Sequence, residues 1–128
     1  MEEAELQSHC DDLLDRFMAA LNAHDSAAMD ACMHFPHVRM AEGVVTVYDA
    51  AGNNPMDLFE KLKARDGWHH SAWNHKRIVQ FNAEKVHLDV RYTRCREDGS
   101  LIGVYDSLYI VTRRNGQWGI QARSSFGP

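Results

Sequence analysis

The chain has 128 residues and carries 18 acidic and 14 basic side chains, so its formal net charge is −4 at pH 7 with histidine neutral. A chain of this length forms one domain, residues 1–128, which buries roughly two thirds of its unfolded surface around a single core. Net negative charge argues against a nucleic-acid partner, because phosphate binding needs an excess of basic residues. The three cysteines are widely spaced, which is typical of a reducing compartment, and no apolar run approaches the length of a membrane span, about 18 residues. We therefore expect a cytoplasmic protein that binds neither nucleic acid nor membrane.

Two helices are predicted in the first third of the chain. Apolar residues recur every three or four positions across Ala4–Ala23, a spacing that lines one face of a helix. Asp25 is a favourable N-cap for a short second helix, Ser26–Met33, which the Phe35-Pro36 pair ends.

A small hairpin and a third helix follow. Val38–Ala41 and Val44–Tyr48 are β-favouring runs joined by a Glu-Gly pair, a combination typical of a hairpin. The clearest helix start in the chain comes next, with Asn54 as N-cap and Pro55 at the first helical position. Gly67 is a typical residue just past a helix end, so we expect the third helix to stop there.

The remainder of the chain predicts a four-stranded antiparallel meander. Asp98-Gly99 and Asn115-Gly116 are dipeptides that readily form two-residue hairpin turns, and Asn82-Ala83 marks a third turn. The strands that these turns join are expected at Ser71–Phe81, Val86–Thr93, Leu101–Thr112 and Trp118–Phe126. This order indicates an α+β domain: a bent antiparallel sheet, made of the N-terminal hairpin and the meander, with three helices covering its concave face.

Tight turns also fix which residues pair across neighbouring strands, and hence which face each side chain occupies. Counting from the turns gives an inner face that is apolar and aromatic with a few hydroxyl groups. The predicted ligand-binding residues are Phe17, Trp73, Tyr105, Ser107 and Tyr109, and the predicted catalytic residues are His75 and Tyr92. A one-residue bulge in the strand Ser71–Phe81 would bring its alternate residues inward instead. The inner side chains either surround a small-molecule site or simply fill the core.

The outer face is predicted to be an interface between two copies of the chain. By sequence neighbours alone, Asp106 looks like a buried acid with a raised pKa, but the register places it opposite Arg91, as in an ordinary cross-strand ion pair. Leu108 and Ile110 lie between these charged rows, and Arg123 is placed on the same face. Exposed apolar groups on an uncovered sheet face favour a homodimer.

The order of elements resembles the NTF2-like, SnoaL-like superfamily of cone-shaped, cystatin-like α+β domains over nearly the whole chain. The residues that carry the likeness are Phe17–Asp25, His34–Tyr48 and, above all, Asp106–Phe126 with its Asn-Gly-x-Trp turn. Members of this superfamily include ketosteroid isomerase, scytalone dehydratase, polyketide cyclases and limonene epoxide hydrolase, together with many pocketed proteins without known activity. The resemblance therefore implies a pocket, while the function stays open.

A dehydratase-like site in this superfamily uses histidines with tyrosines. The residues of this chain that best match such a set are His75, His69 or His70, Tyr92 and Tyr105. A neutral histidine would remove a proton beside a carbonyl group, and a tyrosine would hydrogen-bond the developing oxyanion. The prediction is a protein that binds a small apolar or aromatic ligand and acts as a cofactor-independent acid/base isomerase, dehydratase or cyclase on an apolar carbonyl compound. The alternative is a noncatalytic ligand-binding or dimeric interaction domain with a filled core.

Eight histidines are many for this length, and His34 and His37 form an H-x-x-H pair. Phe35-Pro36 separates them, however, so they do not share one turn of a helix as zinc ligands often do. We expect neither a metal nor a cofactor.

Overall fold

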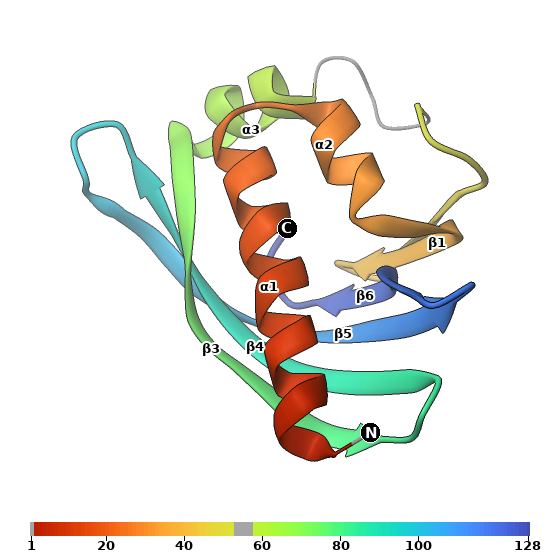
Figure 1. Cartoon of the computed structure of the whole chain (residues 1–128). Helices are drawn as coiled ribbons and strands as arrows, with labels where there is room; N and C mark the ends of the chain where they lie inside the picture. The colour runs from red at the N-terminus through yellow and green to blue at the C-terminus, as the bar shows by residue number, and fades with distance from the viewer. Residues whose placement is uncertain (1, 53–57) are drawn as a thin grey trace.

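The computed structural model describes residues 2–52 and 58–128, which form three helices and six strands (Figure 1). These are α1 (Glu3–Asn22), α2 (Ser26–Ala31), β1 (Met33–Ala41), β2 (Val44–Tyr48), α3 (Leu58–Asp66), β3 (Trp68–Phe81), β4 (Lys85–Arg96), β5 (Leu101–Arg114) and β6 (Gln117–Ser125). The predicted start of the third helix, at Asn54 and Pro55, lies outside the described residues. Of the helices in this part of the chain, none is long and apolar enough to span a bilayer.

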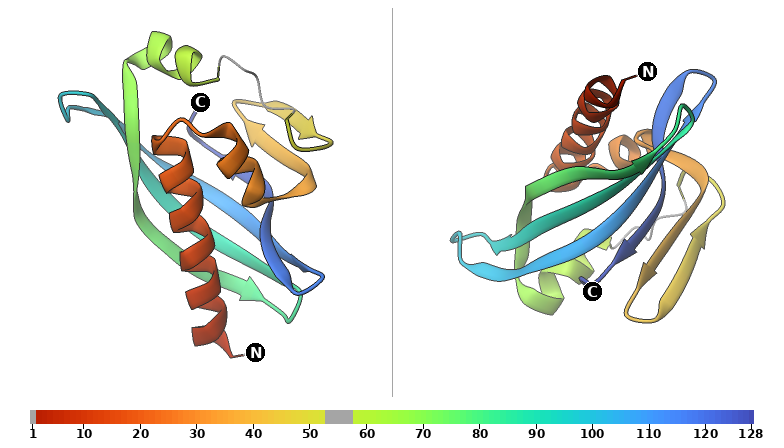
Figure 2. Two further views of the ribbon diagram at one scale, coloured as in Figure 1. Left: turned by 45° about the horizontal axis from the view of Figure 1, so that its top comes forward. Right: turned by 90° about the horizontal axis from the view of Figure 1, so that it is seen from below.

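All six strands join one sheet in the order β2-β1-β6-β5-β4-β3. The meander from β3 to β6 is antiparallel, as predicted. The β1–β2 hairpin joins it through a parallel pairing of β1 with β6, which the sequence pattern does not predict. The sheet curves strongly, and α1 lies across its concave side (Figure 1, Figure 2). The predicted α+β cone is confirmed.

The core lies between α1 and the middle of the sheet. The buried residues on one face of α1 include Leu6, Cys10, Leu13, Leu14 and Phe17. The sheet residues packed in the same core include Val86, Leu88 and Val90 from β4, Val111 from β5 and Ile120 from β6. The helix buries residues at steps of three and four, and β4 buries every second residue, so both predicted periodicities are observed.

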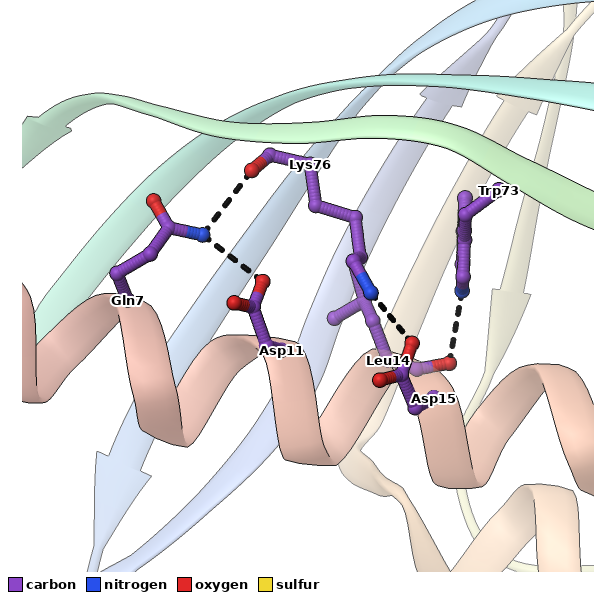
Figure 3. A network of polar contacts seen from close by, with 6 residues as sticks. All are labelled: Gln7, Asp11, Leu14, Asp15, Trp73 and Lys76. Carbon is purple, nitrogen blue, oxygen red and sulfur yellow. Dashed lines mark hydrogen bonds and ion pairs between the residues drawn. The ribbon is translucent and has the colours of Figure 1, made fainter.

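Polar contacts fix α1 against β3, the edge strand (Figure 3). The Gln7 side chain donates to the backbone carbonyl of Lys76 at 3.0 Å, and the Lys76 ammonium group pairs with the Asp15 carboxylate. The indole N–H of Trp73 donates to the carbonyl of Leu14 at 3.0 Å. Because α1 is tied to this strand along its length, the side chains of β3 that point toward the helix are held in place.

Local sequence signals agree with most of the observed turns and caps. The two-residue turn predicted at Asp98-Gly99 is wrong, because the β4–β5 register shifts between Arg94 and Cys95 and Asp98 does not have a positive φ angle. The carboxylate of Asp25 caps α2, accepting a hydrogen bond from the backbone N–H three residues on at 3.0 Å. Asn115 and Gly116 both have positive φ angles, 51° and 77°, as the predicted two-residue turn requires. Two boundaries differ clearly from the prediction: α2 ends at Ala31, and β1 begins at Met33 in place of Val38, because the chain already pairs with β6 from Met33 onward.

The pairing of β6 with β5 contains a bulge that changes the face of its second half. The predicted register pairs Leu108 with Arg123, which would place Arg123 on the outer face. In the structure the register shifts by one residue between Ile110 and Val111, and Arg123 pairs with Tyr109 instead. The outer-face placement of Arg123 is therefore wrong, because a one-residue shift moves every later side chain to the other face.

Gln121 occupies the bulge in β6 and explains why it forms. Its side-chain amide N–H groups donate to the backbone carbonyls of Pro36 and, at 3.4 Å, His34. Its amide oxygen accepts a hydrogen bond from the Thr112 hydroxyl at 2.9 Å. These carbonyls belong to the part of β1 where the pairing with β6 is interrupted, so the Gln121 side chain satisfies backbone groups that the sheet leaves unpaired.

The long edge strand β3 also contains bulges. Trp73 pairs with Tyr92, as predicted, and lies on the inner face. The register then shifts, so His75 pairs with Arg91 and not with Val90. The inner-face placement of His75 is therefore wrong. Bulges of this kind let a long strand bend around a helix, which the curved sheet requires here.

Candidate ligand-binding pocket

A cavity of about 270 Å³ opens between α1, α3 and the concave face of the sheet. Its apolar wall includes Phe17, Met18, Leu21, Met29, Trp68, Trp73, Tyr92 and Tyr109. Its charged lining consists of Arg39, Lys61, Arg65, Arg94 and Arg123. Among the lining residues that the structure describes, none is an aspartate, a glutamate or a histidine. The cavity is thus aromatic and cationic.

The aromatic wall is built around Trp73, which packs edge-on against Tyr92 and Tyr109. The ring centroids are 6.1 and 5.6 Å apart, with interplanar angles of 89° and 84°. Phe17 completes the wall from α1, with its centroid 6.3 Å from that of Tyr109 in another edge-on contact. Such contacts are favourable beyond the area they bury, so the wall keeps its shape without a ligand.

Arg123 is held in the cavity by His37. The Nε–H of Arg123 donates to Nε2 of His37 at 2.9 Å, and Nδ1 of His37 lies 2.9 Å from the carbonyl oxygen of Ile120. His37 therefore carries its proton on Nδ1 and is neutral. Burial first, and then the charge of Arg123, lowers the pKa of His37 to about 4. The guanidinium also lies 5.3 Å from the Phe17 ring centroid, within cation–π range.

Arg39 stands next to Arg123, because the two are partners in the parallel β1–β6 pairing. Burial lowers the pKa of Arg123, the neighbouring Tyr109 opposes that change, and the charge of Arg39 lowers it further. Burial raises the pKa of Tyr109, which keeps its hydroxyl group protonated. Two like charges therefore share one partly buried region of the cavity.

Two of the other three cations, Arg94 and Arg65, have partners of their own. The Arg94 guanidinium lies over two rings, 5.1 Å from the centroid of Tyr105 and 5.6 Å from that of Tyr92. Arg65, on α3, forms an ion pair with Glu42 at 3.2 Å, and both side chains are largely exposed.

The structure brings some of the predicted site residues together and separates others. Phe17, Trp73, Tyr92 and Tyr109 line the cavity. Tyr105 packs against Tyr92 with a centroid distance of 5.8 Å. Ser107 is buried and its hydroxyl bonds within the sheet, to the Ser124 carbonyl and the Ser125 hydroxyl.

His75 is separated from the other predicted residues. On the outer face its Nε2 lies 3.4 Å from the Asp89 carboxylate, so it does not share a site with Tyr92. The other candidate histidines are also engaged elsewhere. His69 and His70 contact each other at 3.0 Å on the exposed surface, and Nδ1 of His34 contacts the Thr112 hydroxyl at 2.9 Å.

The sequence pattern misses Arg39 and Arg123, the two cations on neighbouring strands. Arg123 is missed because of the bulge at Gln121. Arg39 lies between Val38 and Met40, and apolar neighbours in a strand normally indicate that the polar residue between them faces solvent. No simple periodicity finds either residue.

The outer face carries the predicted ion pair. Nε of Arg91 donates to the Asp106 carboxylate at 2.9 Å, and this bond lowers the pKa of that carboxyl group. The ion-pair interpretation of Asp106 is confirmed, and the buried-acid interpretation is wrong. Leu108 lies on the same strand beside it and is 37% exposed.

Comparison with known proteins places the chain in a family. A family model described as NTF2-like protein (DUF6841) matches residues 4–125. The chain belongs to this NTF2-like family. A search of functionally curated protein sequences finds no match.

Solved structures share the NTF2-like fold at low sequence identity. A Nostoc punctiforme protein of unknown function with a cystatin-like fold has a TM-score of 0.76 at 17% identity, covering 94% of this chain and 89% of its own. A Catenulispora acidiphila protein, solved in complex with S-DNPA, has a TM-score of 0.78 at 15% identity, covering 97% and 94%. A ketosteroid isomerase-like protein from Erwinia carotovora atroseptica has a TM-score of 0.66 at 17% identity, covering 93% of each chain. These similarities establish the fold alone.

Proposed function

We propose that this NTF2-like protein binds a small aromatic or apolar molecule inside its cone. The observation that carries the proposal is the cavity of about 270 Å³ with a preformed aromatic wall. Concave apolar sites with a few polar groups are the usual form of small-molecule pockets. A cavity of about 150 Å³ holds a benzene ring, so this cavity has room for one aromatic ring and a substituent. The Catenulispora acidiphila protein of the same fold, solved with S-DNPA bound, gives this proposal support by analogy.

Binding is better supported than acid/base catalysis on a carbonyl compound. Tyr92 and Tyr109 lie in the cavity wall and can hydrogen-bond a ligand oxygen. A general base must reach the proton that it removes, and His75, the predicted base, lies on the other face of the sheet. The described lining contributes no carboxylate side chain and no imidazole in its place. We therefore propose a ligand-binding protein in place of a cofactor-independent isomerase, dehydratase or cyclase.

Titration with a neutral aromatic compound tests the pocket itself. We expect benzyl alcohol to bind the wild-type protein in isothermal titration and to shift the NMR signal of the Trp73 indole N–H. Leu21→Trp should abolish both effects, because Leu21 lines the cavity and the larger ring fills it. Leu101→Trp is the matched control, since Leu101 is 58% exposed on the surface and does not line the cavity. Unchanged binding in Leu21→Trp, or no binding to the wild type, would contradict the proposal.

We also propose that the outer face of the sheet joins two copies of the chain. The face exposes Leu108 beside the Arg91–Asp106 ion pair, and Val104 on the same strand is 49% exposed. Ile110 extends this apolar row along β5. A symmetric dimer would bury these side chains and bring the charged pairs of the two copies together.

Leu108→Glu is expected to give monomers in sedimentation velocity, where the wild type sediments as a dimer. The added carboxylate would lie in the apolar row, next to Asp89, its partner on β4, so burying it against a second copy is costly. Val44→Glu is the control, because Val44 is 61% exposed on the opposite edge strand β2. A monomeric wild type, or dissociation caused by Val44→Glu in place of Leu108→Glu, would rule out the outer-face interface.

A further inference from the structure

The cavity carries more positive charge than the protein around it would suggest. The whole chain has a net charge of −4, yet the described lining contains five cationic residues and no aspartate or glutamate, and of these cations Arg65 is paired with Glu42. Apolar walls reduce the screening of these charges by water, so their field is concentrated inside the cavity. A site of this kind favours a ligand of opposite charge.

Among these cations, Arg39 and Arg123 lie side by side in the cavity lining. They are neighbours on β1 and β6, and in the described chain neither forms an ion pair with a carboxylate. The partners of the Arg123 guanidinium are neutral, namely the imidazole of His37 and the hydroxyl of Tyr109. Buried charges in proteins are normally paired, so two adjacent arginines without a carboxylate are unfavourable in the empty protein.

His37 also orients Arg123. Because Nε2 of His37 accepts the Nε–H of Arg123, that edge of the guanidinium is occupied by the protein. The two terminal amino groups of Arg123 carry its other four N–H donors. The hydroxyl of Tyr109 also forms a hydrogen bond with this side chain. Arginine presents such donors to a carboxylate as a bidentate pair, and a second arginine beside it adds a further charged contact.

We propose that the ligand is a small aromatic carboxylate whose carboxylate group binds between Arg39 and Arg123 while its ring packs against Phe17, Trp73 and Tyr109. This inference rests on the proposed function, because it assigns the chemical class of the molecule that the cavity binds. The cavity of about 270 Å³ has room for one ring with a short acidic substituent. Benzoate and phenylacetate are suitable probes of this class.

The test compares benzoate with benzyl alcohol, its uncharged counterpart, by isothermal titration of the full chain. We expect the wild type to bind benzoate at least about tenfold more tightly, because only benzoate gains the charge-assisted hydrogen bonds. Arg39→Met, which removes the charge but keeps the length of the side chain, should weaken benzoate binding by about tenfold and leave benzyl alcohol binding unchanged. Arg113→Met is the control for net charge, since Arg113 lies over Trp118 and does not line the cavity.

A second measurement distinguishes ligand recognition from a structural role of the same arginine. If Arg39 serves the ligand, the empty Arg39→Met protein should melt no lower than the wild type, because a like-charge contact has been removed. Arg123→Met should also lose benzoate selectivity, and Arg39→Met keeps the test decisive if that variant does not fold.

Binding of benzyl alcohol with equal or weaker binding of benzoate would overturn this inference and leave the proposed pocket intact. Equal loss of benzoate binding in Arg113→Met and Arg39→Met would overturn it too, because the effect would then be one of net charge. If neither compound binds, both the pocket and its charge selectivity are wrong. Inorganic phosphate alone should not compete with benzoate at equal concentration, and full competition would contradict the assigned role of the ring.

Discussion

The protein is expected to lose about 3 kcal/mol of its free energy of unfolding as the pH falls from 6.5 to about 4, because His37 is buried in its neutral form. In the unfolded chain His37 takes up a proton near pH 6.5, whereas in the folded protein it does so only near pH 4. Between these values the unfolded state binds more protons, so stability falls as the pH falls and is fully present above the window. Urea denaturation at half-unit pH steps measures the effect.

His37→Gln provides the matched variant, since glutamine keeps a donor and an acceptor but does not titrate in this range. Its unfolding free energy should fall much less than that of the wild type over the same pH range. His34→Gln is the second control: the pKa of His34 is also lowered by burial, so it contributes in the same direction, but to a smaller extent because its ring is less buried. A wild type whose stability does not change between pH 6.5 and pH 4 would show that His37 is accessible to protons in the folded state.

The parts of the fold that depend on near neighbours in sequence are predicted well. The spacing of apolar residues places α1 to within one residue at each end, and the Asn115-Gly116 turn fixes the pairing of Val111 with Ile120. The β4–β5 register follows as predicted from Lys85 to Arg94, including Arg91 opposite Asp106. These features are set by propensities and turn geometry, which a single sequence contains.

The candidate site is predicted less well, because it depends on bulges. A bulge adds one residue to one strand, and no local pattern in β3 or β6 marks the position. Counting back from the Asn82-Ala83 turn, a shift between Ile78 and Gln80 moves His75 to the other face, and a second shift between Trp73 and His75 returns Trp73 to the predicted face. Arg123 is misplaced in the same way by the bulge at Gln121. Because of these register shifts, the sequence predicts a histidine in the cavity where the structure has an arginine. The expected chemistry therefore changes from proton transfer to anion binding.

The parallel β1–β6 pairing cannot be predicted from local sequence patterns either. Its two strands lie at opposite ends of the chain, so nothing near Arg39 in the sequence indicates that Arg123 will be its neighbour. Adjacent cations on paired strands are disfavoured when only stability is considered. Their presence in a cavity is the kind of local conflict that function is expected to introduce.

Deletion of Gln121 is expected to reduce the free energy of unfolding by about 1 to 3 kcal/mol, because the carbonyls of His34 and Pro36 lose their side-chain donor. Without the extra residue, the two halves of the β5–β6 ladder join in one continuous register, since Val111 still pairs with Ile120 and Ile110 with Ala122. Arg123 therefore stays opposite Tyr109 on the inner face, and the deletion variant should still bind benzoate.

Gln121→Ala separates the backbone effect of the bulge from the side-chain bonds of Gln121. This variant keeps the extra residue but leaves the carbonyls of His34 and Pro36 without the amide, so we expect a similar loss of about 1 to 3 kcal/mol and a cavity that still contains Arg123. Both free energies come from urea denaturation, and benzoate titration reports on the position of the arginine. If the deletion variant lost benzoate binding while Gln121→Ala kept it, the extra residue itself would be needed to hold Arg123 in the cavity, and the continuous ladder would be ruled out. If both variants unfolded at the same urea concentration as the wild type, the side-chain bonds of Gln121 would not stabilise the fold.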